Sequence, residues 1–325
     1  MSWRSNLDWE NAQLRAKIIQ RIRQFFISRQ LCEVETPLLS HGTITDQYID
    51  SLTSRYDFLS DSSKGESDKM YWQTSPEFSM KRLLASGYGS IFQICKAFRH
   101  EEAGRYHNPE FTLLEWYQLD YDHMTLMDEV DDLLRYILNC NKAERFTYQQ
   151  VFLEYVDIDP LNTTTEQLID VIQQSKKLDN WLLSSADNDL LLQYIFSEII
   201  EPNIGKTSPC FIYNFPLSQA SLAKISQEDN RVAERFECYY QGVELANGFH
   251  ELTDVETHLA RFKSDNIKRK HLGKVLKPID QNFIDALAFG LPSCAGVALG
   301  VDRLLMLALE AKHIKEVMSF TIEDA

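Results

Sequence analysis

The sequence predicts an α+β fold, in which an antiparallel sheet is flanked by helices. Residues 90–99 and 110–121 have the apolar character of buried strands, and a charged segment of ten residues joins them, which is typical of an antiparallel pair. Further strand patterns lie at 210–215 and 231–245, but strands and helices do not alternate regularly along the chain. A parallel arrangement of repeated βαβ units is therefore not expected.

The N-terminal region begins with an amphipathic helix. Apolar residues recur at helical spacing over residues 9–29, and a short strand is expected at 31–36, where Pro37 ends it. The following residues 40–68 are polar, and their last part, 61–68, has the composition of a loop.

A second helix is expected to open at Ser75-Pro76-Glu77. Ser75 is a residue type that caps helices, and proline suits the first helical position because its missing N–H is not needed there. Gly87 is expected to end this helix.

The middle of the chain is rich in helical patterns, at 124–138, 164–175 and 187–200. We expect one catalytic domain that covers residues 1–325, with a helical insertion over about residues 150–205. The remaining expected elements are helices at 255–270 and 280–289, a strand at 296–301 and a helix at 302–311.

Composition narrows the possible functions. The chain of 325 residues carries 33 basic and 48 acidic residues, so its net charge of −15 repels phosphate backbones, and nucleic acid is an unexpected partner. It has no apolar run of the roughly 18 residues that a membrane span requires, and no secretory signal is expected at the N-terminus. The six cysteines form no CxxC pair, and we expect them to be buried, reduced thiols of a cytoplasmic protein.

The first cluster with chemical potential lies between the two predicted strands. It comprises FRHEE at 98–102 and RYHNPEF at 105–111. The guanidinium group of Arg99 is a planar fork suited to phosphate or carboxylate oxygens, and Phe111 could stack on a base. A solvated hairpin tip remains the alternative.

The second cluster is ELANGFHE at 244–251. Asn247-Gly248 between strand-like residues predicts a two-residue hairpin turn, which would place Glu244 directly opposite Glu251. Facing carboxylates repel each other unless a cation lies between them, and that cation could be magnesium or a ligand's ammonium group. The alternative is an exposed pair that splays apart.

The third cluster is GVALGVDRLLML at 296–307, a strand of small residues that leads into a helix. Glycines such as Gly300 let a ligand approach the backbone. Arg303 falls at the helix N-terminus, where the helix dipole disfavours a cation, so a bound anion would offset the conflict. The alternative is that Arg303 pairs with an acid.

These clusters, in this order, resemble the motifs of class II aminoacyl-tRNA synthetases. FRHEE with RYHNPEFTLLEWY resembles motif 2, GVALGVDRLLML resembles motif 3, and the first helix with CEVETPLLS resembles motif 1. TSPEFSMKRLL and ELANGFHELTD are most similar to the lysyl-tRNA synthetase subgroup. The resemblance spans roughly residues 10–320 and implies a homodimer formed through motif 1.

Two departures from the lysyl subgroup are informative. An anticodon-binding barrel needs on the order of 100 residues, and motif 1 begins too early to leave room for it, so no such domain is expected. Ala298 stands where the subgroup usually has glycine, which should change the amino-acid pocket. A chain of this kind is similar to the bacterial ligases that activate (R)-β-lysine and transfer it to a lysine side chain of elongation factor P.

The resemblance implies ATP and Mg²⁺ as cofactors, (R)-β-lysine or lysine as substrate, and elongation factor P as acceptor. It implies Arg99 and Arg303 as catalytic residues, and a wider ATP-binding set of Arg99, His100, Glu101, His107, Asn108, Phe111, Glu244, Leu245, Gly300 and Arg303. The implied substrate-binding residues are Ser75, Pro76, Glu77, Tyr117, Glu251 and Ala298. Glu244 and Glu251 are the implied metal ligands, although Glu251 has the substrate amine as a second possible partner.

Within the same fold, a short enzyme similar to lysyl-tRNA synthetase, with tRNA or a small amine as acceptor, is the alternative. A regulator that only senses lysine-like compounds is a third reading, but such paralogues usually lose a motif arginine, and Arg99 and Arg303 are both present here.

Overall fold

The computed structural model describes residues 3–56, 69–100, 103–175 and 187–325. The chain divides into two compact units, which are described separately below. The first unit comprises residues 1–120, 253–294 and 298–325, and the second comprises 121–252 with 295–297. Both contain strands and helices, so the α+β prediction is confirmed.

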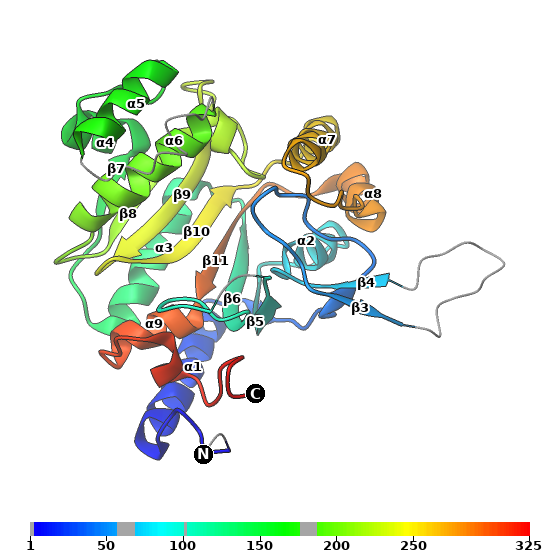
Figure 1. Cartoon of the computed structure of the whole chain (residues 1–325). Helices are drawn as coiled ribbons and strands as arrows, with labels where there is room; N and C mark the ends of the chain where they lie inside the picture. The colour runs from blue at the N-terminus through cyan, green and yellow to red at the C-terminus, as the bar shows by residue number, and fades with distance from the viewer. Residues whose placement is uncertain (1–2, 57–68, 101–102, 176–186) are drawn as a thin grey trace. The chain divides into compact units, whose positions relative to one another are not determined.

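The sheet of the first unit has the strand order β1-β5-β6-β11 (Figure 1). Its strands are β1 (Cys32–Glu33), β5 (Ile91–Phe98), β6 (Glu110–Leu119) and β11 (Cys294–Gly300), whose residues 295–297 belong to the second unit. β5 and β6 are antiparallel, with Phe98 opposite Glu110, as the sequence predicted. β1 is shorter than expected and runs parallel to β5.

The first unit has a second, small sheet, whose strands were not predicted from the sequence. Its strand order is β2-β4-β3, with bounds Leu39–Ser40, Lys69–Trp72 and Thr53–Arg55. The loop predicted at 61–68 lies outside the described residues.

The helices of the first unit are α1 (Trp9–Ser28), α2 (Glu77–Ala85), α7 (Val255–His271), α8 (Gln281–Gly290) and α9 (Val301–Ala308). The apolar face of α1 packs on the sheet, where the ring of Phe26 lies 4.9 Å from that of Phe92 and 5.0 Å from that of Trp116. α2 begins with Pro76 in the cap position and has no side-chain capping bond, so the prediction that Ser75 caps it is wrong.

The second unit has the strand order β11-β10-β9-β8-β7. The bounds of its elements are α3 (His123–Leu138), β7 (Glu144–Thr147), α4 (Tyr148–Val156), α5 (Thr165–Gln174), α6 (Asn188–Ile195), β8 (Cys210–Pro216), β9 (Val232–Tyr240) and β10 (Val243–His250). The expected helices of the insertion are present, and a π-helix, Phe196–Ile200, continues α6. Their apolar side chains pack with Cys210, Ile212 and Tyr239 in one core.

The hairpin between β9 and β10 turns at a different place from the one predicted. Tyr240 pairs with Val243, so Gln241 and Gly242 form the two-residue turn, and both have positive φ values, of 51° and 74°. Asn247 and Gly248 lie inside β10, opposite Glu237 and Phe236. A side chain at position 248 would meet the Phe236 ring at 2.6 Å and Val297 at 2.8 Å, so this glycine makes room for packing.

The turn gives a direct prediction. Replacement of Gln241 by asparagine should raise the free energy of unfolding by roughly 0.5 kcal/mol, because asparagine tolerates the left-handed conformation that this turn requires. Urea denaturation measures the change. The control Gly242→Ala should lower the same free energy by about 1 kcal/mol, and a gain in stability from it would contradict the assigned turn.

All six cysteines are free, but their burial differs. Cys210, Cys238 and Cys294 are buried, as expected, whereas Cys32 is exposed on the short strand β1. In the part of the chain that the structure describes, no helix combines the length and the apolar character needed to cross a membrane.

Candidate active site

Arg99 and Phe111 meet where β5 and β6 separate. Their strands pair up to Phe98 and Glu110, and the Arg99 N–H then donates to the carbonyl of Pro109 at 2.9 Å. This register brings the guanidinium carbon of Arg99 to 5.2 Å from the ring centroid of Phe111. A cation and an aromatic face, both selected from the sequence, therefore lie side by side.

Arg303 of α9 reaches the same connecting segment, although 196 positions separate it from His107. One of its terminal nitrogens lies 2.8 Å from His107 Nε2, and its Nε donates to the carbonyl of Tyr106 at 3.3 Å. The two arginines thus both contact residues 106–111, Arg99 at one end and Arg303 at the other. The first unit brings together the motif 2 and motif 3 residues that the sequence selected.

Asp302 fixes the helix that carries Arg303. Its side chain is 2% exposed, and its two oxygens accept from Arg15 at 2.7 Å and from the Thr112 N–H at 2.6 Å. The acid beside Arg303 in sequence is therefore occupied by the first helix and by β6. Both oxygens of Asp302 are thus bonded to groups other than Arg303.

The connecting segment is anchored by residues near the C-terminus. The amide of Asn108 donates to the Glu110 carbonyl at 2.6 Å, and its oxygen accepts from the Ile322 N–H at 3.0 Å. Arg105 donates to the Lys312 carbonyl at 2.9 Å. Asn108, expected to contact ATP, has a holding role in this structure.

Two other residues expected to contact nucleotide, His100 and Gly300, lie in the described part of the first unit. His100 is exposed, and its N–H donates to the Asp50 carbonyl at 2.8 Å. Gly300 occupies the N-cap of α9, and together with Ala298 it lies on the half-buried face of β11, while Leu299 is buried on the other. Glu101 lies outside the described residues.

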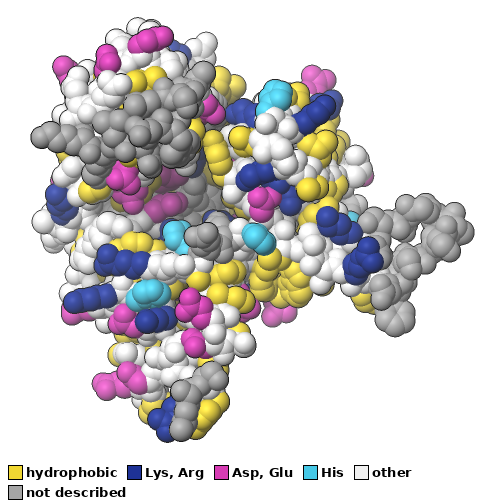
Figure 2. Space-filling view, viewed as in Figure 1, with side chains coloured by type: hydrophobic (Ala, Val, Ile, Leu, Met, Phe, Trp, Pro, Cys, Tyr) yellow, Lys and Arg dark blue, Asp and Glu magenta, His cyan; other side chains and the backbone are white. Residues whose placement is uncertain are grey.

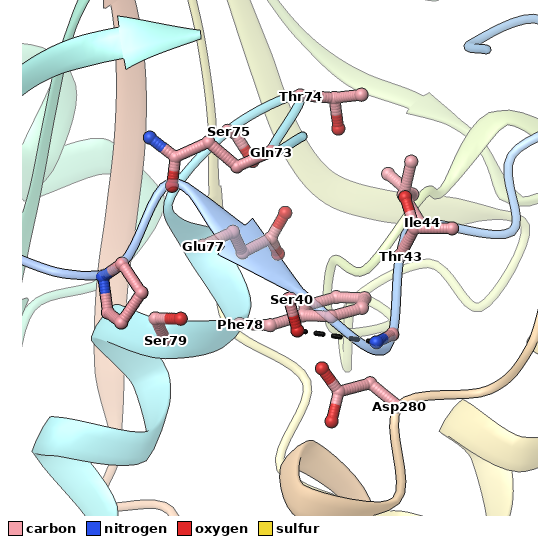
Figure 3. A pocket seen from close by; sticks show the side chains of 12 residues that line it. Ser40, Thr43, Ile44, Gln73, Thr74, Ser75, Glu77, Phe78, Ser79 and Asp280 are labelled. Carbon is pink, nitrogen blue, oxygen red and sulfur yellow. Dashed lines mark hydrogen bonds between the residues drawn. The ribbon is translucent and has the colours of Figure 1, made fainter. Parts of the chain in front are cut away.

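A pocket of the first unit is bordered by Ser75 and Glu77 (Figure 3). The loop at 40–44 forms its other side, and that loop packs closely on Asp280, since a Cβ atom at Gly42 would lie 2.4 Å from the Asp280 side chain. Glu77 directs its carboxylate into this pocket, so a residue expected to bind substrate lines a cavity.

The carboxylate of Glu77 belongs to a buried charge cluster. It accepts from the ammonium group of Lys81 at 2.6 Å, and Lys81 is 0% exposed. Lys81 also lies 6.0 Å from the ring of Tyr117, whose hydroxyl donates to Glu115 at 2.7 Å. The formal charges of Glu77, Lys81 and Glu115 add up to −1.

Lys81, which lies beside Glu77 in this cluster, was not singled out from the sequence. The signal for Lys81 was available, because a lysine four positions after Glu77 on a helix lies on the same face. Its burial could not be foreseen, since lysine is rarely buried fully.

The second unit contains a polar network on β9 and β10. Glu237 accepts from Arg235 at 2.5 Å, from Asn247 at 3.1 Å and from the hydroxyl of Tyr239. Burial raises the pKa of Glu237; Arg235 opposes the rise, and the negative charge of Glu244 adds to it. The sequence analysis did not mark Arg235 or Glu237 as site residues.

The predicted pairing of Glu244 with Glu251 across a hairpin is wrong. Glu244 lies opposite Tyr239, and a bulge at Leu245 follows it, whereas Glu251 comes just after the same strand and bridges to Ala223. Seven residue steps of extended chain at about 3.3 Å each separate their Cα atoms by roughly 20 Å. The hairpin register that was expected to bring the two carboxylates together on one cation is therefore absent. Glu251 is 2% exposed and Leu245 is equally buried.

Comparisons with known proteins place the sequence in a family. The sequence model of the family described as "tRNA synthetases class II (D, K and N)" matches residues 1–324. The elongation factor P–(R)-β-lysine ligase of Salmonella typhi is 52% identical to the chain over 328 residues, which cover 100% of the chain and 98% of that ligase. The similarity therefore includes every residue of the candidate site.

Proposed function

The chain belongs to the class II (D, K and N) tRNA synthetase family, and on this premise we propose that it is an ATP-dependent ligase that activates (R)-β-lysine and transfers it to a lysine side chain of elongation factor P. The full-length similarity to a ligase of that name supports the substrate and the acceptor. The observation that carries the chemistry is the convergence of Arg99 and Arg303 on residues 106–111.

In the first half-reaction, a carboxylate oxygen of the substrate attacks the α-phosphorus of ATP. The bond from that phosphorus to the bridging oxygen breaks, and pyrophosphate leaves. A carboxylate is ionised at neutral pH, so this step needs no general base. The protein's task is to hold the reactants in line and to offset the negative charge that gathers around the phosphorus.

The arginines suit this task because each presents a planar set of donors to phosphate oxygens. We assign Arg99 to the α-phosphate and the attacking carboxylate, and Arg303 to the γ-phosphate. The Phe111 ring, already beside Arg99, would stack on the adenine, and Glu101 would accept from its amino group. His107, which lies against Arg303, would adjoin the phosphates, with His100, Asn108 and Gly300 completing the nucleotide site.

The residues present suit a magnesium ion that binds together with ATP, because the phosphates then supply part of its ligands. Within the described ranges, no three His, Cys, Asp or Glu residues are grouped so that they could hold a metal ion. Mg²⁺ commonly takes one or two carboxylates and completes its shell with substrate phosphates and water. Glu244, a partly exposed carboxylate, is our proposed ligand, with Leu245 adjoining the nucleotide, and bound Mg²⁺ would offset charge on the phosphates.

The cluster around Glu77 supports a diamine substrate. Its net negative charge attracts an ammonium group, and Lys81 holds the Glu77 carboxylate in place at the pocket wall. We propose that Ser75, Pro76 and Glu77 bind one amine of the substrate, and that Tyr117 and Glu251 bind the other. Ala298 would narrow the amino-acid pocket by one methyl group relative to glycine.

In the second half-reaction, an amine of the acceptor attacks the carbonyl carbon of the adenylate, an amide bond forms, and AMP leaves. We propose a cytoplasmic location for this reaction, as a translation factor requires. We also propose a homodimer formed through α1, which exposes Trp9 and Ile27.

Two measurements on the purified protein test the proposal. Exchange of labelled pyrophosphate into ATP should depend on (R)-β-lysine, and elongation factor P incubated with ATP and (R)-β-lysine should gain the mass of one β-lysyl group on one lysine. If exchange occurs and charged tRNA, not modified elongation factor P, is the product, the proposed acceptor is wrong. If no lysine-like compound supports exchange, activation itself is refuted.

A further inference from the structure

The C-terminal part of α7 and the loop after it form a strongly basic segment, residues 261–277. This segment contains seven Lys and Arg residues and one acid, a formal charge of +6. The whole chain carries −15, so the rest of it carries −21. Asp50, outside the segment, pairs with Arg269, Lys274 and Lys277, whereas Lys263 and Lys270 are exposed. Exposed positive charge on a protein of opposite net sign favours an acidic partner.

The basic segment also exposes four aliphatic side chains. The exposed fractions are 57% for Ile267, 57% for Leu272, 71% for Val275 and 53% for Leu276. Figure 2 shows Lys, Arg and hydrophobic side chains gathered over α7. Lys263, Ile267 and Lys270 follow helical spacing and are all exposed, so charge and apolar surface share one face of α7. Such a mixture is typical of an interface between proteins.

Buried anchors hold this surface in a fixed form. Arg269 is 1% exposed and pairs with Asp50 at 2.5 Å, and Lys274 donates to the Gln47 carbonyl at 2.7 Å. Asn266 and Lys277 exchange two hydrogen bonds, of 3.0 and 2.9 Å, across the loop. Val275 and Leu276 are therefore presented outward without a large ordering cost on binding.

We propose that the exposed face of residues 263–276 is the docking surface for the acceptor protein, through an acidic face of that protein that carries apolar side chains. This proposal rests on the proposed function, since it concerns the transfer step. Its basis is charge complementarity, because the exposed lysines of this segment, Lys263 and Lys270, stand on an acidic chain and favour an acidic partner. A nucleic acid is disfavoured, since the chain as a whole carries a net charge of −15, which repels phosphate backbones.

The test uses two variants of the full chain and one matched control. Lys263→Glu/Lys270→Glu reverses two exposed charges, and Val275→Ser/Leu276→Ser removes exposed apolar surface. The control, Lys142→Glu/Lys206→Glu, reverses two exposed lysines outside the basic segment. Calorimetric titration with elongation factor P, without ATP, measures docking, and β-lysine-dependent pyrophosphate exchange measures activation.

Both variants should raise the Kd for elongation factor P by roughly tenfold or more and lower kcat/KM for transfer in proportion, while exchange and the control's Kd stay unchanged. The effect of the charge variant should shrink as salt rises. Unchanged Kd and transfer in both variants would overturn docking. Docking would also be overturned if the variants lost binding to tRNA but kept binding to elongation factor P. The same holds if sedimentation showed that the variants dissociate a dimer, because the surface would then join two copies of the chain. A chain that binds the acceptor through this face but shows no exchange would refute the proposed function alone.

Discussion

Replacement of Arg303 by alanine is expected to lower β-lysine-dependent pyrophosphate exchange by about 10³-fold or more, while leaving the fold intact. Arginines that offset charge at a transferring phosphorus contribute on this scale. The side chain is half-buried and contacts Tyr106 and His107, so its removal leaves no packed core open. Exchange of labelled pyrophosphate into ATP measures the loss.

Two controls make the result specific. Arg82→Ala removes an exposed arginine of α2 and should leave exchange unchanged. Arg303→Lys keeps the charge but loses the planar fork, and it should recover part of the activity. Exchange by Arg303→Ala within a few-fold of the unmodified chain would show that Arg303 does not contact the triphosphate.

Replacement of Asp302 by alanine is expected to lower the free energy of unfolding by about 3–5 kcal/mol. The change removes the buried carboxylate that accepts from Arg15. It also leaves the buried Thr112 N–H without its acceptor. α9 would lose its link to α1 and β6, so exchange should fall as well. Urea denaturation measures the stability.

The matched control is Asp128→Ala. Asp128 also pairs with an arginine, Arg145, at 2.6 Å, but its side chain is 67% exposed, and such pairs contribute about 1 kcal/mol or less. The double variant Arg15→Ala/Asp302→Ala should lose less than the sum of its two single variants, because the partners act on each other. If Asp302→Ala and Asp128→Ala lowered the free energy of unfolding by the same small amount, Asp302 would not be the residue that holds the helix of Arg303 in place.

The sequence was sufficient to predict the part of the site that local patterns determine. Two apolar strands around a charged segment gave the β5–β6 pair, and that register places Arg99 beside Phe111. The contact of Arg303 with the same segment spans 196 positions. It was expected from the resemblance to a family, and spacing in one sequence could not supply it.

The hairpin of the second unit shows why local turn signals can fail. Asn247-Gly248 is a stronger turn signal than Gln241-Gly242, yet the chain turns at the latter. Gly248 is required by the ring of Phe236, and the Asn247 side chain bonds to Glu237. Both requirements arise from contacts between strands, and turn propensities take no account of such contacts. Because the turn lies elsewhere, Glu244 and Glu251 do not face each other as predicted.

The burial of Lys81 is a second feature that the sequence could not reveal. Spacing places Lys81 near Glu77, but only the fold encloses the ammonium group beside Tyr117 and Phe283. The negative balance of this cluster then depends on Glu115, which comes from a separate strand.

A crystal structure of the protein with bound ATP tests the central claim most directly. We expect the guanidinium groups of Arg99 and Arg303 to donate hydrogen bonds to phosphate oxygens of one nucleotide, with the Phe111 ring parallel to its adenine. Guanidinium groups that contact separate ligands, or a nucleotide bound away from residues 106–111, would contradict the account.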